Sequence, residues 1–323
     1  KIDASGESFA ITSGPQFFSQ YPVQHLSVTP AGLPESDIGY VVATNDSIKS
    51  NIVTVCIHGN PTSKFLYRNI IPYISEACNT VIAPDLMAMG DSPIPKGVTD
   101  FSLDIHYAYI REFLDTIVPS DKKIVLVVQD WGSGIGFRYA HERSERIAGL
   151  VFFEAILEEF AFADVPLANK IIFRLFRGLL GSFINQRLNF FIKYFLGSAG
   201  SIRKPTSSEM QEYLRPYPTY DSLKVVAQWP CEIPFADHSL ETGDRNRDKI
   251  VATGEYIFET NAFPKVFLHA SPGAIIDEAK KDRYIAKLGD TAVAVDLGKG
   301  LHYLQEDHPA AIGMAVSALL QQL

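Results

Sequence analysis

The fold of this chain is decided by one stretch, Lys123-Ile-Val-Leu-Val-Val-Gln-Asp130-Trp-Gly-Ser-Gly-Ile-Gly136. Its first half is a short apolar run typical of a buried strand, and its second half is rich in small residues that begin a helix. Small residues let the backbone turn sharply between the two, which is the strand–turn–helix pattern that exposes a nucleophile at its tip. Asp130 occupies that tip. A helix-capping aspartate has the same local pattern, so Asp130 stands out only through the motifs found elsewhere in the chain.

Outward from this stretch, short apolar runs alternate with segments of helical pattern. Continuous apolar runs separated by helices are typical of parallel strands that are covered on both faces. We therefore expect an α/β fold with a mostly parallel, doubly wound sheet. The predicted strands are residues 51–57, 80–83, 123–128, 147–153, 265–270 and 292–297, and the predicted helices before residue 150 are 65–77, 104–117 and 132–142.

The alternation stops between about residues 157 and 234, where the sequence is helical in pattern and rich in aromatic residues. An insertion after one strand of such a sheet can lie over the carboxyl ends of the strands, which is where ligands bind. We therefore predict a core domain of residues 1–156 and 231–323. A helical cap of residues 157–230 is predicted as an insertion in that core.

Composition narrows the function classes. The 323 residues are 46% hydrophobic and 20% charged, which is ordinary for a globular protein and excludes a disordered chain. The net charge of −8 gives no general attraction for phosphate backbones, so nucleic acid is not an expected partner. Residues 171–195 are apolar but interrupted by arginines and a lysine, so no membrane-spanning helix is expected. Three cysteines without a pairing pattern fit a cytoplasmic protein best, with the periplasm as an alternative.

Three further residues accompany Asp130. Asn60 lies in His58-Gly-Asn-Pro61, a loop that follows a predicted strand and can supply a backbone N–H to an oxyanion. Glu154 ends the predicted strand after the elbow, and His302 follows the last predicted strand. The order nucleophile, acid, histidine is that of the α/β-hydrolase plan. Because all of them follow strands of one sheet, we expect them to meet in space.

These motifs resemble those of haloalkane dehalogenases in the α/β-hydrolase superfamily, in particular the subgroup whose catalytic acid follows the sixth strand. The resemblance covers roughly residues 51–309, and only loosely in the cap. One departure is Ala88, where the family usually has glycine. The matching passages include His58-Gly-Asn-Pro-Thr-Ser63, Gln129-Asp-Trp-Gly132, Val151-Phe-Phe-Glu-Ala-Ile156, Trp229-Pro230 and Leu301-His-Tyr-Leu-Gln-Glu-Asp307.

The resemblance implies a role for each residue. Asp130 would attack the carbon that carries the halogen, and a carboxylate suits this because it is ionised at neutral pH without a base. His302 would then activate water to hydrolyse the ester, oriented by Glu154. The side chains of Asn60 and Trp131 would bind the halide, and their backbone N–H groups would form the oxyanion hole.

The same resemblance implies no metal and no organic cofactor. The expected partners are a small apolar halogenated substrate, water and the halide product. No nucleic acid and no membrane are expected as partners. The chain is expected to be a monomer or a small homo-oligomer.

Other readings stay open at this stage. An epoxide hydrolase shares the aspartate and the histidine but uses cap tyrosines, and Tyr213, Tyr217 and Tyr220 are expected to pack at the surface of a loop instead. A cofactor-independent, luciferase-like monooxygenase resembles the dehalogenases closely. A non-catalytic binding module is a third class. We interpret His58 as a structural hydrogen-bonding residue and Asp277 as a surface residue.

Overall fold

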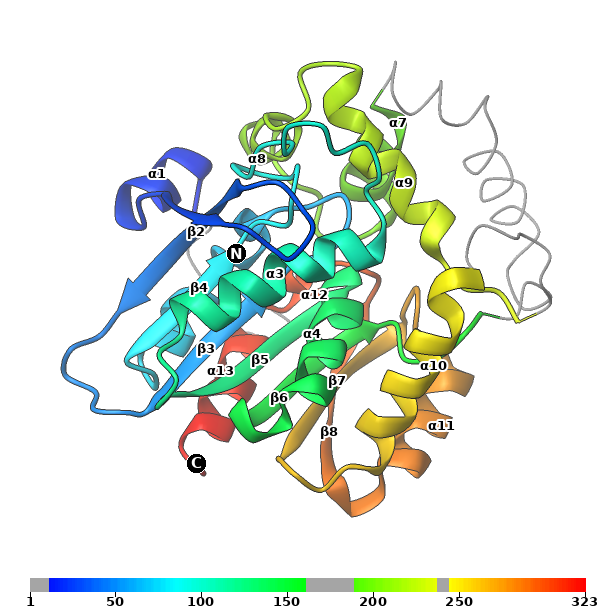
Figure 1. Ribbon diagram of the computed structural model, residues 1–323. Coiled ribbons are helices and arrows are strands. Elements are labelled where there is room, and N and C mark those ends of the chain that lie inside the picture. Colours follow the sequence, from blue (N-terminus) through cyan, green and yellow to red (C-terminus); the bar gives the residue numbers. More distant parts are fainter. Residues whose placement is uncertain (1–11, 161–188, 237–243) are drawn as a thin grey trace.

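The computed structural model describes residues 12–160, 189–236 and 244–323 (Figure 1). Eight strands form one sheet in the order β1-β2-β4-β3-β5-β6-β7-β8. The pairs β1–β2 and β2–β4 are antiparallel, and all other pairs are parallel, which confirms the predicted mostly parallel sheet. The strands are β1 Gln24–Val28, β2 Ser36–Thr44, β3 Ile52–Ile57, β4 Thr80–Pro84, β5 Lys123–Asp130, β6 Ile147–Ala155, β7 Lys265–Pro272 and β8 Ala292–Gly300.

Helices cover both faces of the sheet (Figure 1). Helices α3, α4 and α10 pack next to one another, and α13 packs against α2 and β7 behind the sheet. The α-helices are α1 Gly14–Gln20, α2 Ile71–Ser75, α3 Leu103–Ile117, α4 Trp131–Glu142, α7 Phe190–Tyr194, α8 Ser207–Leu214, α9 Lys224–Glu232, α10 Asp244–Glu259, α11 Glu278–Leu288, α12 Leu304–Asp307 and α13 Pro309–Leu320. The shorter turns are η1 Lys64–Tyr67, η2 Ser144–Arg146, η4 Phe195–Ala199, η5 Asp221–Leu223 and η7 Gly289–Thr291.

The predicted helix over residues 65–77 is wrong as a single element. The structure has the 3₁₀ turn η1 followed by the five-residue helix α2, with Pro72 in the first turn of α2. Proline has no backbone N–H and its ring clashes with the carbonyl four residues earlier, so Pro72 disfavours a continuous helix through this position. Proline is tolerated where a helix starts, which is where this one lies.

Strand β5 lies at the centre of the sheet, between β3 and β6. Its residues Ile124–Val128 have no solvent exposure. Burying one such aliphatic side chain contributes roughly 1.5–3 kcal/mol, so β5 is held firmly within the sheet. Asp130 is the last residue of this strand.

The elements α7, α8 and α9 lie beyond the carboxyl ends of the central strands (Figure 1). Part of the predicted cap of residues 157–230, namely residues 161–188, lies outside the described residues. The division into core and cap therefore stays a prediction, and α9 runs past residue 230, where the predicted boundary was drawn. Within the described ranges, no helix is long and apolar enough to cross a membrane.

Candidate active site

Asp130 lies on a strained turn between β5 and α4. Its φ of 51° and ψ of −133° are unusual for a residue other than glycine, and such conformations gather at functional sites. A Cβ atom on Gly132 would lie 2.2 Å from the Ile57 carbonyl oxygen, so only glycine fits at this turn. Ser133 donates to the Asp130 carbonyl and accepts from the Ile156 N–H at 2.8 Å. These contacts hold the predicted elbow.

The loop after β3 reaches the Asp130 carboxylate. The backbone N–H of Asn60 donates to Asp130 Oδ2 at 2.8 Å, and the backbone N–H of Trp131 also hydrogen-bonds to this carboxylate. A Cβ atom on Gly59 would lie 2.2 Å from the same Oδ2, so the loop approaches this closely only because residue 59 is glycine. Two backbone donors therefore converge on one side of Asp130.

Glu154 owes its position to a β-bulge. In the β5–β6 pairing Gln129 lies opposite Phe153 but Asp130 lies opposite Ala155, so Glu154 is the extra residue, with a φ of 42°. Bulges next to active sites redirect a side chain. The Glu154 carboxylate accepts backbone N–H groups of the loop after β7, at 3.1, 2.7 and 3.4 Å from Ala274, Ile275 and Ile276.

His302 lies between the two carboxylates. Its Nε2 is 3.6 Å from Asp130 Oδ1, and its Nδ1 is 3.3 Å from Glu154 Oε2. All three residues are buried. The backbone N–H groups of His302 and Tyr303 both donate to the Gly200 carbonyl, at 2.9 and 2.7 Å, so the histidine loop is anchored to the segment after η4. The structure thus brings the three predicted catalytic residues together in the expected order.

Burial and charge perturb the titration of this site. Burial raises the pKa of Asp130, and the positive charge on His302 and the backbone N–H groups of Trp131 and Asn60 oppose that rise without cancelling it. Burial alone lowers the pKa of His302, but the hydrogen bond to Glu154 and the charges of Asp130 and Glu154 outweigh it, so the net pKa is raised. Perturbed groups that face each other in this way are typical of catalytic sites.

The side chains of Asn60 and Trp131 lie under helix α9. Asn60 Nδ2 makes a long hydrogen bond of 3.5 Å to the Val226 carbonyl, and its Oδ1 has no hydrogen-bond partner. The Trp131 indole packs against Trp229, with ring centroids 4.8 Å apart. Asn60 keeps a second amide hydrogen free for a ligand.

A buried ionic cluster supports the helix that follows His302. Glu306 in α12 accepts two hydrogen bonds from Arg68, at 2.8 and 2.9 Å, and further ones from Arg203 and from the Tyr213 hydroxyl. Glu209 pairs with Arg68 at 2.6 Å and with Arg203 at 2.9 Å. The cluster ties α8 to the core beneath the histidine loop.

The expectation of surface packing is wrong for Tyr213 and Tyr217, which are 1% and 2% exposed. Tyr213 is helical and hydrogen-bonds inside the cluster, and Tyr217 follows the end of that helix. The interpretation of Asp277 holds, because it is exposed and caps α11. His58 is a structural residue as expected, since its ring contacts the Gly59 carbonyl at 2.8 Å and accepts the Leu86 N–H at 3.0 Å.

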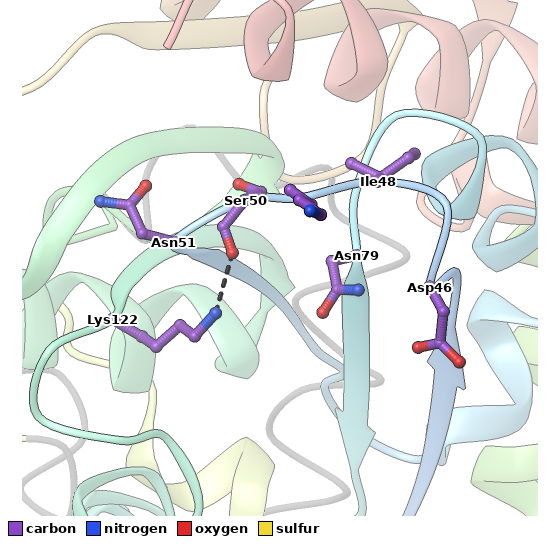
Figure 2. A pocket seen from close by; sticks show the side chains of 7 residues that line it. Asp46, Ile48, Ser50, Asn51, Asn79 and Lys122 are labelled. Carbon is purple, nitrogen blue, oxygen red and sulfur yellow. Dashed lines mark hydrogen bonds between the residues drawn. The ribbon is translucent and has the colours of Figure 1, made fainter.

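A polar hollow of about 470 Å³ lies at the amino-terminal ends of β3 and β5, away from Asp130 at the carboxyl end of β5 (Figure 2). Its lining residues Asn51 and Lys122 directly precede β3 and β5, whereas Asp130 ends β5 and Asn60 follows β3. The lining is mostly polar and Lys122 donates to the Ser50 carbonyl across it (Figure 2). We do not assign substrate binding to this hollow, because none of the predicted catalytic residues is among its lining residues.

Sequence reasoning missed three parts of the site: Gln129, the Gly200 carbonyl and the backbone amides of the loop after β7. Gln129 directly precedes Asp130 in the sequence, and this proximity could have marked it as part of the site. The other two are backbone groups of distant segments, and no side-chain pattern marks them.

Comparison with known proteins identifies the family of this chain. Residues 53–309 match the family model of the alpha/beta hydrolase fold. A haloalkane dehalogenase of Sphingobium indicum is 33% identical over 82% of this chain and 87% of its own length, and one of Mesorhizobium japonicum is 32% identical over 90% and 89%. The crystal structure of the haloalkane dehalogenase DbeA from Bradyrhizobium elkani superimposes with a TM-score of 0.81 at 27% identity, covering 94% of this chain and 98% of that one.

The fold, the elbow and the family match define an α/β-hydrolase. Within that superfamily, the chain belongs to the haloalkane dehalogenases, which are hydrolases that act on carbon–halide bonds.

Proposed function

We propose that this enzyme hydrolyses haloalkanes through an alkyl ester on Asp130. The proposal rests on the contacts of the buried His302 ring with two buried carboxylates. Its Nε2 lies 3.6 Å from Asp130 Oδ1, and its Nδ1 lies 3.3 Å from Glu154 Oε2. A nucleophile, a base and an orienting acid in that order can perform both halves of a two-step hydrolysis.

In the first step, a carboxylate oxygen of Asp130 forms a bond to the halogenated carbon, and the halide leaves with the electron pair of the carbon–halogen bond. The attack needs no proton removal, because the nucleophile is ionised. Negative charge grows on the leaving halide, and side-chain N–H groups of Asn60 and Trp131 would stabilise it.

In the second step, water attacks the carbonyl carbon of the Asp130 ester while His302 Nε2 takes its proton. Glu154 accepts the hydrogen on Nδ1 and stabilises the imidazolium. The oxyanion would be bound by the backbone N–H groups of Asn60 and Trp131, which already contact this carboxyl group. Collapse of the intermediate releases an alcohol, so the net reaction consumes water and yields alcohol, halide and a proton.

We add to this proposal the substrate class, the cap, the compartment and the oligomeric state. The substrate is a small apolar halogenated molecule, admitted under a helical cap of residues 157–230, and no cofactor takes part. We place the enzyme in the cytoplasm, with the periplasm as the alternative, as a monomer or a small homo-oligomer without nucleic-acid or membrane partners.

Epoxide hydrolysis is the second candidate, and it depends on where the cap tyrosines point. Tyr213 donates its hydroxyl to Glu306, and Tyr220 is 43% exposed. Neither observation supports a tyrosine pair aimed at Asp130, so dehalogenation is preferred.

Two variants test the proposal with 1,2-dibromoethane as substrate. Asp130→Ala should release no bromide, whereas His302→Phe should release about one bromide per active site and then stop as a covalent ester. Mass spectrometry should find the alkyl group on Asp130 in His302→Phe. Asp290→Ala, which removes an exposed aspartate, is the control and should turn over normally. Undiminished bromide release by Asp130→Ala would refute the proposal.

A further inference from the structure

We propose that Gln129 is a positioning residue for the ester-hydrolysis step, whose side-chain amide holds the His302 ring in its proton-accepting orientation. This inference rests on the proposed function, because it assigns a role within the second step. Gln129 is the residue before the nucleophile, has no solvent exposure and lies on the central strand β5.

The amide nitrogen of Gln129 lies over the face of the imidazole. Its Nε2 is 3.1 Å from His302 Nε2 and 3.4 Å from His302 Nδ1. A hydrogen bond in the ring plane to one nitrogen would leave the other far more distant, so near-equal distances place the amide above the ring. The in-plane lone pair of Nε2, which must accept the proton from water, is therefore left available.

The orientation of the Gln129 amide is fixed at both ends. Its Nε2 is also 3.2 Å from the backbone carbonyl of His302, which only accepts hydrogen bonds, so the nitrogen rather than the oxygen must face it. Its Oε1 accepts from Gln305 Nε2 at 3.3 Å, and Gln305 is itself buried in α12. One side chain thus contacts the ring and the backbone of His302 and is held by the next helix.

The electrostatic effect on the ring follows from the groups that face it. Asp130 from β5 and Glu154 from β6 carry negative charge and favour the protonated imidazolium. Lys280 acts on Glu154 from α11, and the neutral Tyr303 ring lies 4.6 Å from the imidazole. The amide hydrogens of Gln129 carry partial positive charge, so they oppose protonation. Gln129 therefore helps to keep His302 neutral between two carboxylates, as a base must be.

Removal of this amide should affect one chemical step and not the other. In Gln129→Met, ester hydrolysis should slow by about 2- to 10-fold at neutral pH, which is the usual net effect of one buried hydrogen bond. The pH at which hydrolysis reaches half its maximum should rise by roughly 0.4–1 unit, because the base becomes easier to protonate. The alkylation rate should stay unchanged, since that step needs no base.

The test follows bromide release and ester breakdown from 1,2-dibromoethane by rapid quench across pH. Gln305→Met removes the side chain that holds the Gln129 amide. It should raise the pH of half-maximal hydrolysis as Gln129→Met does, but by a smaller amount. Val125→Ala is the matched structural control, because Val125 is buried four residues earlier on β5. Val125→Ala should lower the melting temperature without changing the pH of half-maximal hydrolysis.

The outcomes separate the two proposals. A wild-type enzyme that releases no bromide from 1,2-dibromoethane refutes the proposed function. A normal burst together with wild-type pH profiles in Gln129→Met and Gln305→Met refutes the role of Gln129 alone, and so does an equal shift in Val125→Ala. If Gln129→Met fails to fold, Gln305→Met decides by the same criterion.

Discussion

Replacing Glu154 by glutamine would test the orienting role of this acid with little change in shape. The carboxylate accepts three backbone N–H groups and faces His302 Nδ1 at 3.3 Å. In Glu154→Gln one oxygen becomes an NH₂ group, which donates where an acceptor is needed. Either a backbone N–H loses its acceptor or the histidine does, and the imidazolium loses its neighbouring negative charge.

The size of the expected loss in ester hydrolysis follows from the kind of hydrogen bond that Glu154→Gln removes. Hydrogen bonds to a charged group contribute about 1.5–3 kcal/mol, which corresponds to a loss in ester hydrolysis of roughly 10- to 100-fold. Where the replaced acid also fixes the histidine tautomer, the cost in comparable triads is about 10⁴-fold. We therefore expect hydrolysis to fall by between about 10² and 10⁴, with alkylation almost unchanged.

The assay is the bromide burst in rapid quench, combined with mass spectrometry of the alkyl ester on Asp130. Glu154→Gln should give a full burst, followed by slow turnover and an accumulated ester. Glu158→Gln is a suitable control, because Glu158 pairs with Arg283 near the surface. Steady-state turnover within twofold of wild type, or equal loss of both steps, would show that Glu154 does not orient the base.

Three further predictions concern the leaving group, the base and the support of the site. Asn60→Ala should slow the bromide burst by about 10²–10³, the typical effect of one lost donor to developing charge, with a much smaller effect on breakdown of a preformed ester. The hydrolysis rate should decline as pH falls through the His302 pKa, which is raised above the ordinary value of histidine, because only the neutral ring takes a proton. A decline centred below that ordinary value would contradict the assigned contacts with Glu154 and Asp130. Glu306→Gln should lower the unfolding free energy by about 3–5 kcal/mol in urea titrations, because it leaves the Arg68 guanidinium buried and poorly paired; an unchanged midpoint would contradict this.

The parts of the site predicted from sequence are those with local signatures. The apolar run of β5 and the small residues after Asp130 predict the elbow, and strand ends predict that Glu154 and His302 lie near it. Strand β1 was missed because it is largely exposed and carries no apolar run. Strand β2 was missed although most of its residues are buried and it contains the apolar run Tyr40–Ala43. The bulge that aims Glu154 was not foreseeable either, because it arises from the pairing of two strands and not from residue type.

Tertiary contacts also overrode a local interpretation. The prolines around Tyr217 predict a loop. The segment between α8 and η5, which contains Tyr217, is indeed irregular. The burial of Tyr213 depends on Glu306, which is 93 residues later in the chain. No local pattern records such a partner, so the sequence placed this tyrosine at the surface.

The Gly200 carbonyl has a consequence for engineering by segment exchange. It accepts both the His302 and the Tyr303 backbone N–H, and a Cβ atom on residue 200 would lie 2.4 Å from the Tyr303 ring and from the Phe195 carbonyl. A transplant of residues between β6 and α8 from another dehalogenase would therefore replace not only part of the predicted cap but also the carbonyl that anchors the His302 loop. Chimeras joined after Gly200 would inherit the donor's setting of His302, whereas those joined before η4 would retain the host's. Substrate range and turnover would then vary independently only in the second design.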